Sequence, residues 1–359
     1  MFGNYYQGKN VFVTGHTGFK GSWLSAWLIK LGASVTGYAL PPSYDESHFQ
    51  LLGLSKKIRH IEGDVRDRER LARTMAEATP DIVFHLAAQA LVREAYRDPG
   101  YTFDTNVMGS VNVCEVVRKV ESVRTLVYIT SDKCYRNVEW EWGYRETDML
   151  GGRDPYSASK GCAELVFDAY WTSFLSKIDR LTAASTRAGN VIGGGDWAKD
   201  RLIPDCIRAL RKKETIYIRH PNSTRPWQHV LEPLGGYLHL GRHLGGPKGM
   251  DLCKSWNFGP NNSANKNVGA VVKDVIRLWG GGNFATEFDA SAPPEDNWMQ
   301  LNSDRANQFL NWSPTWNYPE SIAETIDWYR RHEEGADIPA LTESQIEKYT
   351  EAWKAAGRD

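Results

Sequence analysis

The sequence predicts an α/β protein: a doubly wound, mostly parallel sheet with a smaller α/β domain interleaved towards the C-terminus. The first observation is that apolar runs of strand length alternate with amphipathic runs of helix length from residue 9 to residue 130. The second is that this alternation becomes irregular after residue 186, where Gly and Pro cluster, as at residues 193–195 and 293–294. A smaller domain that shares pieces with the sheet explains both patterns.

The elements of the first half follow in order. Residues 9–14 form a buried strand because Val11, Phe12 and Val13 are a continuous apolar run. Residues 22–31 form a helix that ends at Gly32 and carries its large apolar side chains on one face. Further strands are expected at residues 34–40, 81–87 and 124–130, and further helices at residues 68–77 and 106–120.

The second half is expected to return to the sheet. Asp154 and Pro155 start a helix, with Asp154 as its cap and Pro155 in the first turn, and residues 230–244 form a helix that packs back on the sheet. The first domain therefore comprises residues 1–186 plus returning pieces near 230–260. The second comprises residues 187–229 and 261–335, and residues 336–359 are expected to form a polar, partly mobile tail.

The composition excludes several classes of protein. Of the 359 residues, 41% are hydrophobic and 24% are charged, which is ordinary for a soluble globular chain. A net charge of −1 argues against nucleic acid or an anionic membrane as partner, and no apolar run is long enough to cross a bilayer. The five cysteines are widely spaced with no C-x-x-C pair, so we predict no disulfide framework, no metal site and a cytoplasmic location.

A glycine-rich turn joins the first strand to the first helix. It reads Gly15, His16, Thr17, Gly18, Phe19, Lys20 and Gly21, with the spacing G-x-x-G-x-x-G. Glycines allow the backbone to approach a pyrophosphate, and the helix that follows offers free N–H groups and the positive end of its dipole. The turn predicts a dinucleotide site of the Rossmann type, against the alternative of an ordinary strand–helix turn.

Two details of this cofactor site stand out. His16 is large for its position and is predicted to crowd the pyrophosphate and weaken binding. The second strand ends without the usual acidic residue for the adenosine ribose and without an Arg for a 2′-phosphate, which favours NAD over NADP. Other residues assigned to the cofactor follow the later strands or start a helix: Asp64, Val65, Ala87, Ala88 and Asn106.

Tyr156 and Lys160 are candidates for hydride-transfer chemistry. They are four residues apart and therefore share one helix face. A free tyrosine has a pKa of about 10, and a nearby ammonium favours the phenolate, so Lys160 is predicted to lower the pKa of Tyr156. Tyr156 would then act as base, and Lys160 would also hold the nicotinamide ribose. The motif alone arises often by chance, but the glycine turn upstream makes it specific.

Ser131, Asp132 and Lys133 follow a predicted strand of the sheet, where open α/β sheets bind their ligands. Ser131 is suited to hydrogen-bond Tyr156 and a substrate hydroxyl. Asp132 would donate a proton to a departing hydroxyl, and Lys133, as a neutral amine, would remove a proton next to a ketone. An acid and a base beside Tyr156 predict an elimination in addition to the redox step. The alternative is a solvated surface loop, which we disfavour because Tyr156 is present.

These motifs together resemble those of the nucleotide-sugar 4,6-dehydratases, which are extended short-chain dehydrogenase/reductases. Lys133 stands where the dTDP-glucose branch carries Glu, and this is similar to the CDP-glucose branch. The segments GNVIGGGDW at residues 189–197 and RPWQHV at residues 225–230 support the same branch. The resemblance runs from about residue 8 to about residue 330, nearly the whole chain.

The resemblance implies NAD as cofactor and CDP-D-glucose as substrate. Tyr156 would serve oxidation at carbon 4, Lys133 would take the carbon 5 proton, and Asp132 would protonate the carbon 6 hydroxyl. The product would be CDP-4-keto-6-deoxy-D-glucose, a precursor of 3,6-dideoxysugars in lipopolysaccharide O-antigen. A homodimer, or alternatively a tetramer, is implied, formed through the helices that carry Tyr156 and residues 106–120.

The second domain would hold the nucleoside diphosphate. Arg225 is a candidate clamp because a guanidinium matches phosphate oxygens bidentately. Arg187 and Asn190 match the family's substrate-side Arg-x-x-Asn, and Arg201 and Arg219 are further candidates. For each arginine the alternative is a surface salt bridge.

Three other functions stay open. A UDP-N-acetylglucosamine 4,6-dehydratase also uses Asp-Lys. A nucleotide-sugar 4-epimerase needs hydride transfer alone, and the Asp132–Lys133 pair counts against it. A catalytically silent cofactor-binding protein is disfavoured because Ser131, Tyr156 and Lys160 are intact.

Overall fold

A seven-stranded parallel sheet forms the centre of the computed structural model, which describes residues 1–287 and 297–358. The strand order is β3-β2-β1-β4-β5-β6-β11, so the chain reverses direction across the sheet between β1 and β4. This confirms the predicted doubly wound α/β fold. The strands are β1 (Asn10–Thr14), β2 (Ser34–Ala39), β3 (Arg59–Glu62), β4 (Ile82–His85), β5 (Thr125–Ile129), β6 (Thr182–Arg187) and β11 (Ser255–Asn257).

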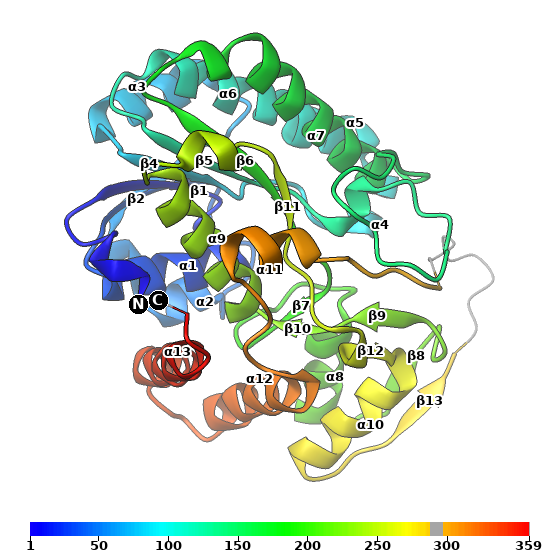
Figure 1. Ribbon diagram of the computed structural model, residues 1–359. Coiled ribbons are helices and arrows are strands. Elements are labelled where there is room, and N and C mark those ends of the chain that lie inside the picture. The colour runs from blue at the N-terminus through cyan, green and yellow to red at the C-terminus, as the bar shows by residue number, and fades with distance from the viewer. Residues whose placement is uncertain (288–296, 359) are drawn as a thin grey trace.

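Helices cover both faces of the sheet (Figure 1). One face carries α3 (Arg68–Ala78), α6 (Gly109–Lys119) and α7 (Pro155–Ser173), and the other carries α1 (Phe19–Lys30) and α9 (Leu231–Leu244). Because the strands are buried on both faces, the apolar core is divided into two large clusters. Shorter helices complete this part: α2 (His48–Leu51), α4 (Val92–Arg97), α5 (Pro99–Phe103) and a π-helical turn, η3 (Asp104–Met108).

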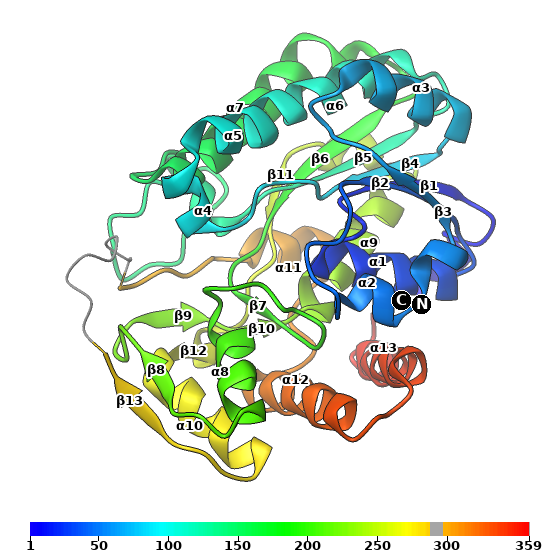
Figure 2. The ribbon, with the colours of Figure 1, turned by 180° about the vertical axis from the view of Figure 1, so that it is seen from behind.

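The second domain lies below the carboxyl ends of the strands in Figure 1 and is seen from behind in Figure 2. It contains α8 (Leu202–Arg211), α10 (Val268–Trp279) and α12 (Tyr318–Glu333), and α11 (Asp304–Leu310) lies beside β11. Three small two-stranded sheets join its loops. They pair β7 (Val191–Ile192) with β10 (Gln228–His229), β9 (Thr224–Pro226) with β12 (Asn265–Asn267), and β8 (Ile216–Ile218) with β13 (Phe284–Thr286).

The predicted mobile tail is wrong, because residues 338–355 form the ordered helix α13 (Ile338–Ala355). Tyr349 and Trp353 of this helix are fully buried, and the helix packs beside α1 and α12. The carboxylate of Glu232, on α9, accepts a hydrogen bond of 3.0 Å from the Tyr349 hydroxyl. The segment is polar in composition, but its apolar residues recur at helical spacing and form one face. The packing of this face determines the structure here.

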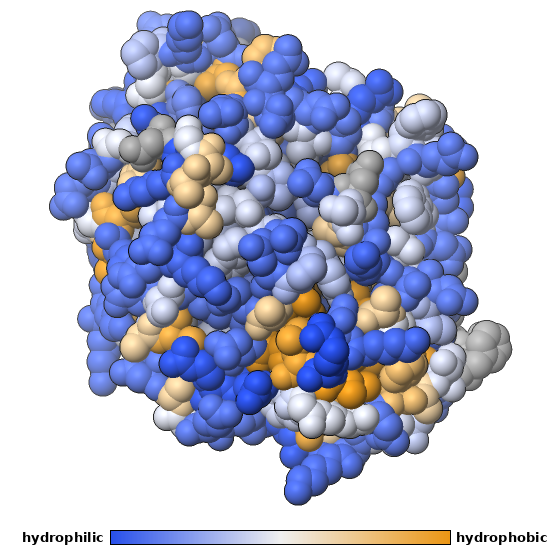
Figure 3. Space-filling view, turned by 60° about the horizontal axis from the view of Figure 1, so that its bottom comes forward, coloured by the Kyte–Doolittle hydropathy of each residue, from blue (hydrophilic) through white to orange (hydrophobic). Residues whose placement is uncertain are grey.

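The surface agrees with the ordinary composition. The face shown in Figure 3 is mostly hydrophilic, with apolar areas near its lower edge. Within residues 1–287 and 297–358, no helix combines the length and the apolar character needed to cross a bilayer. All five cysteines are free thiols.

Candidate active site

The glycine turn forms a cradle at the carboxyl end of β1. Gly15 has a φ of 76°, and a Cβ there would stand 2.7 Å from the backbone nitrogen of Ala87. A Cβ on Gly21 would stand 2.1 Å from the Gly15 carbonyl oxygen. Gly18 is the N-terminal cap of α1, exposed and extended, and no side chain caps the helix there. These features leave bare backbone and free N–H groups at a helix start, which fits the pyrophosphate of a dinucleotide.

Hydrogen bonds hold the cradle against the neighbouring strands. The Thr14 hydroxyl oxygen accepts from the backbone nitrogens of Leu86 and Ala87, at 3.1 and 3.2 Å. The Thr17 hydroxyl donates to the carbonyl oxygen of Leu40 at 2.8 Å, beyond the end of β2. The structure thus brings the glycine turn together with Ala87 and the adjoining Ala88, as the sequence predicted.

His16 lies away from the cradle, so the prediction that it crowds a pyrophosphate is wrong. Its fully buried ring lies over Gly37 of β2, where an added Cβ would stand 2.3 Å from it. Its Nε2 lies 2.7 Å from Nδ1 of His60, and the ring meets Phe49 edge to face. Burial and His60 lower the pKa of His16 to about 3, so the ring is neutral. Gly37, which is distant in the sequence, provides the space for this ring. No local sequence pattern predicts this packing.

Asn106 is also placed differently from the prediction. Its amide nitrogen donates to the Gln89 carbonyl oxygen at 3.0 Å and to the Ser159 hydroxyl at 2.9 Å. Its amide oxygen accepts from the Gln89 backbone nitrogen at 2.8 Å. The buried amide is therefore used within the protein, and Asn106 fastens the π-helical turn to α7 instead of contacting a cofactor.

Asp64 and Val65 lie just beyond β3, where the sequence placed them. The Asp64 carboxylate accepts from the Arg66 side chain at 2.7 Å. Burial raises the pKa of Asp64, but Arg66 more than offsets this, and the pKa lies below its usual value. Val65 is buried against Gly109 at the start of α6. The backbone carbonyl oxygens are also used within the protein: that of Asp64 accepts from the Tyr38 hydroxyl at 2.9 Å, and that of Val65 accepts from the Asn112 amide nitrogen at 3.0 Å.

The loop after β5 carries Ser131, Asp132 and Lys133 at the carboxyl end of the sheet, where Asp132 lies beside Gly189. Asp132 and Lys133 lie in the short 3-10 turn η4 (Asp132–Cys134), which Ser131 caps. The Ser131 hydroxyl donates to Asp132 Oδ1 at 2.8 Å and also interacts with the Tyr156 phenol. A Cβ on Gly189 would stand 3.0 Å from Asp132 Oδ2, so glycine keeps the space beside that carboxylate open. The structure therefore joins the predicted redox and elimination residues in one site.

Burial dominates the charges of this site. It raises the pKa of Asp132 above its usual value, against the opposing effects of Lys133, Ser131 and Lys20. It raises the pKa of Tyr156 to about 12, although Ser131 and Arg201 act to lower it. Burial also lowers the pKa of Lys160 to about 8. The prediction of a lowered Tyr156 pKa is therefore wrong for the protein alone, because Lys160 lies 5.9 Å from the ring centre and desolvation outweighs the cations.

Lys20 is a site residue whose role the sequence reasoning missed. It was assigned with the rest of the cradle, but its ammonium interacts with Asp132, Lys160 and Arg201. Burial lowers its pKa to about 8, and Arg201 adds to this effect. Lys20 shares a face of α1 with Trp23, whose indole nitrogen donates to the Gly194 carbonyl oxygen at 2.9 Å. A lysine at this position in a glycine-rich turn, facing the second domain, was the available signal.

The candidate substrate residues of the second half of the chain have the following contacts within the protein. Arg201 is ion-paired with Asp196 at 2.9 Å and interacts with Tyr156. Arg225, on β9, is mostly buried, and its side chain donates to the Thr224 carbonyl oxygen at 3.0 Å. The backbone carbonyl oxygen of Asn190 accepts from the Gln228 backbone nitrogen at 3.2 Å, and the Arg219 guanidinium lies 3.9 Å from the Asp200 carboxylate.

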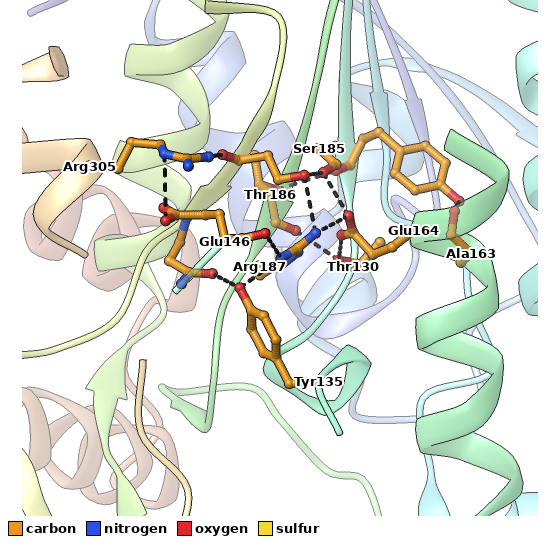
Figure 4. Close-up of polar contacts among 12 residues, drawn as sticks. Thr130, Tyr135, Glu146, Ala163, Glu164, Ser185, Thr186, Arg187 and Arg305 are labelled. Carbon is orange, nitrogen blue, oxygen red and sulfur yellow. Dashed lines mark hydrogen bonds and ion pairs between the residues drawn. The ribbon is translucent and has the colours of Figure 1, made fainter. Parts of the chain in front are cut away.

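The prediction that Arg187 faces the substrate is wrong. Its guanidinium is buried and forms an ion pair of 2.7 Å with Glu164 on α7. It also donates to the Tyr135 hydroxyl at 2.7 Å and to the Glu146 carbonyl oxygen at 3.1 Å (Figure 4). The sequence motif places Arg187 correctly at the end of β6. Its guanidinium, however, is paired with the buried carboxylate of Glu164, which belongs to another element.

Known proteins share this architecture. The family described as GDP-mannose 4,6 dehydratase matches residues 12–325. The CDP-glucose 4,6-dehydratase of Salmonella typhimurium is 46% identical over 353 residues, which are 97% of this chain and 98% of that protein.

Two solved structures share the fold at lower identity. The dTDP-glucose 4,6-dehydratase of Bacillus anthracis, in complex with NAD, has a TM-score of 0.76 at 22% identity, covering 90% of this chain and 97% of that one. The UDP-glucose 4-epimerase of Thermus thermophilus, also with NAD, has a TM-score of 0.75 at 23% identity, covering 89% and 98%. Fold, site and sequence agree: the chain belongs to the GDP-mannose 4,6 dehydratase family.

Proposed function

We propose that this protein is an NAD-dependent CDP-glucose 4,6-dehydratase, which forms CDP-4-keto-6-deoxy-D-glucose and water. The observation that carries the proposal is the joining of Asp132, Ser131 and Tyr156 in one buried site. The likeness to the Salmonella enzyme, at 46% identity over nearly the full length of both chains, supports CDP-glucose as the substrate.

The charges of the cleft suit a nucleoside diphosphate. Lys20, Lys160 and Arg201 interact with the reacting residues, and Arg225 on β9 is a further candidate for the phosphates. These cations favour a substrate with phosphate groups, and guanidinium groups hold phosphate oxygens bidentately. Gly189 leaves room beside Asp132 for the sugar.

The chain's own groups divide the proton steps. NAD, held by the glycine cradle, Ala87 and Lys160, would accept a hydride from the sugar and later return it. Tyr156 takes the proton of the carbon 4 hydroxyl, with Ser131 and Arg201 favouring its charged form. The resulting ketone makes the carbon 5 proton acidic, and Lys133 removes it. Burial raises the pKa of Asp132, so its carboxyl holds a proton more readily. Asp132 gives this proton to the departing carbon 6 hydroxyl.

The direct test is a substrate comparison with purified protein and NAD. CDP-glucose is expected to give the ketone that absorbs in base, with kcat/KM at least tenfold above those for dTDP-glucose, UDP-glucose and UDP-N-acetylglucosamine. An alkali-stable epimer as the product would favour the 4-epimerase. Preference for another nucleotide would reassign the substrate and leave the dehydratase mechanism in place.

We further propose a homodimer that forms through α7 and the helical segment of residues 106–120, together with the neighbouring α4 and α5. Large apolar side chains are exposed there, including Tyr96, Phe103, Met108 and Leu165, the last 57% exposed. Such a patch on one face is typical of a protein interface. Leu165→Glu is expected to halve the mass measured by light scattering, while Phe309→Glu, an exposed site on α11, leaves it unchanged. An unchanged mass for Leu165→Glu would refute this interface.

The biological setting follows from the proposed reaction. A 4-keto-6-deoxy sugar on CDP is a substrate for further deoxygenation and reduction, so we place the enzyme in dideoxysugar synthesis for lipopolysaccharide O-antigen. The free thiols support a reducing, cytoplasmic environment.

A further inference from the structure

A buried ion pair connects the two halves of the active site. Glu164 lies on α7 one turn after Lys160 and two turns after Tyr156, and Arg187 ends β6. Their side chains are 1% and 3% exposed and meet at 2.7 Å. Neither group takes part in the proton steps proposed above. Both side chains nevertheless lie next to the loop that carries Ser131, Asp132 and Lys133.

The pair holds both ends of that loop (Figure 4). The hydroxyl of Thr130, the residue before Ser131, donates a hydrogen bond to Glu164 Oε1. The hydroxyl of Tyr135, which directly follows the 3-10 turn η4, accepts from Arg187 Nη1 at 2.7 Å. One ion pair therefore bridges the helix of Tyr156 and the start and end of the acid–base loop.

Further bonds lock the pair in place. Glu164 Oε2 also accepts from the Ser185 hydroxyl at 2.8 Å, and Arg187 Nη2 donates to the Ser255 hydroxyl at 3.1 Å. Tyr135 in turn donates to Asn257 Oδ1 at 2.8 Å. The contacts reach β6 and β11, so the clamp is anchored in the rigid sheet. These bonds hold both side chains of the pair in one orientation.

Glu164 also faces the charge of Lys160. The groups around Lys160 are Tyr156 and Glu164 on α7, His85 on β4, Cys134 in the loop and Lys20 on α1. Burial keeps His85 neutral, with a pKa of about 3, and raises the pKa of the Cys134 thiol. Burial acts to raise the pKa of Glu164, but Arg187 outweighs this and keeps the carboxyl ionised. Among these described neighbours, Glu164 supplies the negative charge that favours the Lys160 ammonium.

We propose that Glu164 and Arg187 are positioning residues for the dehydration: together they fix the Ser131–Asp132–Lys133 loop against the helix that carries Tyr156 and Lys160. This inference rests on the proposed function, since it names the residues whose geometry the elimination needs. A displacement of about 1 Å at a reacting group is enough to lower a rate about a hundredfold.

The test compares four variants with the wild-type enzyme on CDP-glucose and NAD. Glu164→Gln removes the charge but keeps the shape. Arg187→Lys keeps both charges but loses the fork that reaches Tyr135. The double variant Glu164→Gln with Arg187→Met removes both charges, so it avoids an unpaired buried ion. Glu232→Gln is the control, because Glu232 is an equally buried carboxylate outside this site.

Glu164→Gln is expected to lower kcat at least tenfold with KM for CDP-glucose within twofold. It is also expected to move the alkaline limb of the kcat profile at least about half a pH unit lower, because Lys160 loses a neighbouring negative charge. Arg187→Lys is expected to lower kcat without moving that limb. The double variant is expected to have a melting temperature closer to that of the wild type than Glu164→Gln has. It is nevertheless expected to keep both defects, the lower kcat and the shifted alkaline limb.

Hydrogen exchange gives a readout independent of activity. The Cys134 and Tyr135 amides, bonded to Ser131 and Asp132 carbonyl oxygens at 3.1 and 3.2 Å, are expected to exchange at least tenfold faster in Glu164→Gln and in the double variant, but not in Glu232→Gln.

The outcomes separate the two proposals. A double variant with wild-type kcat, pH limb and exchange rates would overturn the clamp, as would the same changes in Glu232→Gln. A wild-type enzyme inactive on CDP-glucose would instead contradict the proposed function, and the exchange measurement would still decide whether the pair holds the loop.

Discussion

At the scale of single residues, desolvation sets the chemistry of the site. Asp132 is buried, and its pKa is raised above the usual value, so it carries a proton to a higher pH than an exposed aspartate. Tyr156 is a phenol in the protein alone, with its pKa raised by burial to about 12. The cationic ring of a bound cofactor would oppose this effect of burial and favour the phenolate that Tyr156 needs to act as a base.

Asp132→Asn tests the role of the acid. The amide keeps the shape but has no acidic proton, so elimination is expected to slow by a factor of about 10² to 10⁴. Oxidation at carbon 4 should proceed, so NADH absorbance at 340 nm is expected to accumulate on the enzyme in a single turnover. Product formation at the wild-type rate would show that another group protonates the departing hydroxyl.

Lys20→Met tests the newly identified cation. Lys20 acts to lower the pKa of Asp132, so its removal is expected to raise that pKa further and keep the acid protonated to higher pH. The alkaline limb of kcat/KM should therefore move to higher pH, by about half a unit or more. Lys20→Arg, which keeps the charge, should leave the limb in place. A profile unchanged in Lys20→Met would mean that Lys20 serves the cradle alone.

At the scale of elements, the strongly periodic segments were predictable. Predicted strand 9–14 is β1 (Asn10–Thr14), predicted helix 68–77 is α3 (Arg68–Ala78), and predicted helix 230–244 is α9 (Leu231–Leu244). Among the elements that were not predicted, two show the physical reason. The edge strand β3 (Arg59–Glu62) is polar and only partly buried, and α13 (Ile338–Ala355) gains its order from distant partners. Tertiary contacts, rather than local preference, form both.

The site shows the same division. Motif spacing placed Ser131, Asp132, Tyr156 and Lys160 together, because strand ends and one helix face fix their positions. The sequence failed where a side chain had two possible partners. Arg187 forms an ion pair with Glu164, and the His16 ring packs over Gly37. Both partners lie on other elements of the fold.

The docking of α13 gives a pH-dependent prediction. Burial raises the pKa of Glu232 from 4.5 to about 7, against hydrogen bonds from the Trp316 and Thr315 backbone nitrogens and Tyr349. The folded protein favours the protonated form of Glu232, so the contribution of this carboxyl to the free energy of unfolding is fully present below about pH 4.5. The contribution is lost as the pH rises through 7, by an amount on the order of 3 kcal/mol.

Urea unfolding of wild type and Glu232→Gln between pH 4.5 and 8 measures this term. The wild-type free energy of unfolding, relative to that of Glu232→Gln, is expected to fall as the pH rises towards 8. A difference between the two proteins that does not vary with pH would contradict a protonatable Glu232 in the folded state.

At the scale of the whole molecule, the two domains share the work of one site. The sheet carries the cradle, Ser131, Asp132 and Tyr156, and Arg201, just before α8, interacts with Tyr156. Gly189 leaves space beside the Asp132 carboxylate. We propose that the sugar lies at the redox residues and that Arg201 and Arg225 bind the nucleotide.

The central claim is that oxidation and elimination occur in sequence on one bound sugar. The most direct measurement follows CDP-glucose labelled with deuterium at carbon 4 and identifies the product by NMR and mass spectrometry. The account predicts CDP-4-keto-6-deoxy-glucose with the deuterium at carbon 6, because the hydrogen taken from carbon 4 returns there after loss of water. A 4-epimer that keeps its carbon 6 hydroxyl and its deuterium at carbon 4 would contradict it.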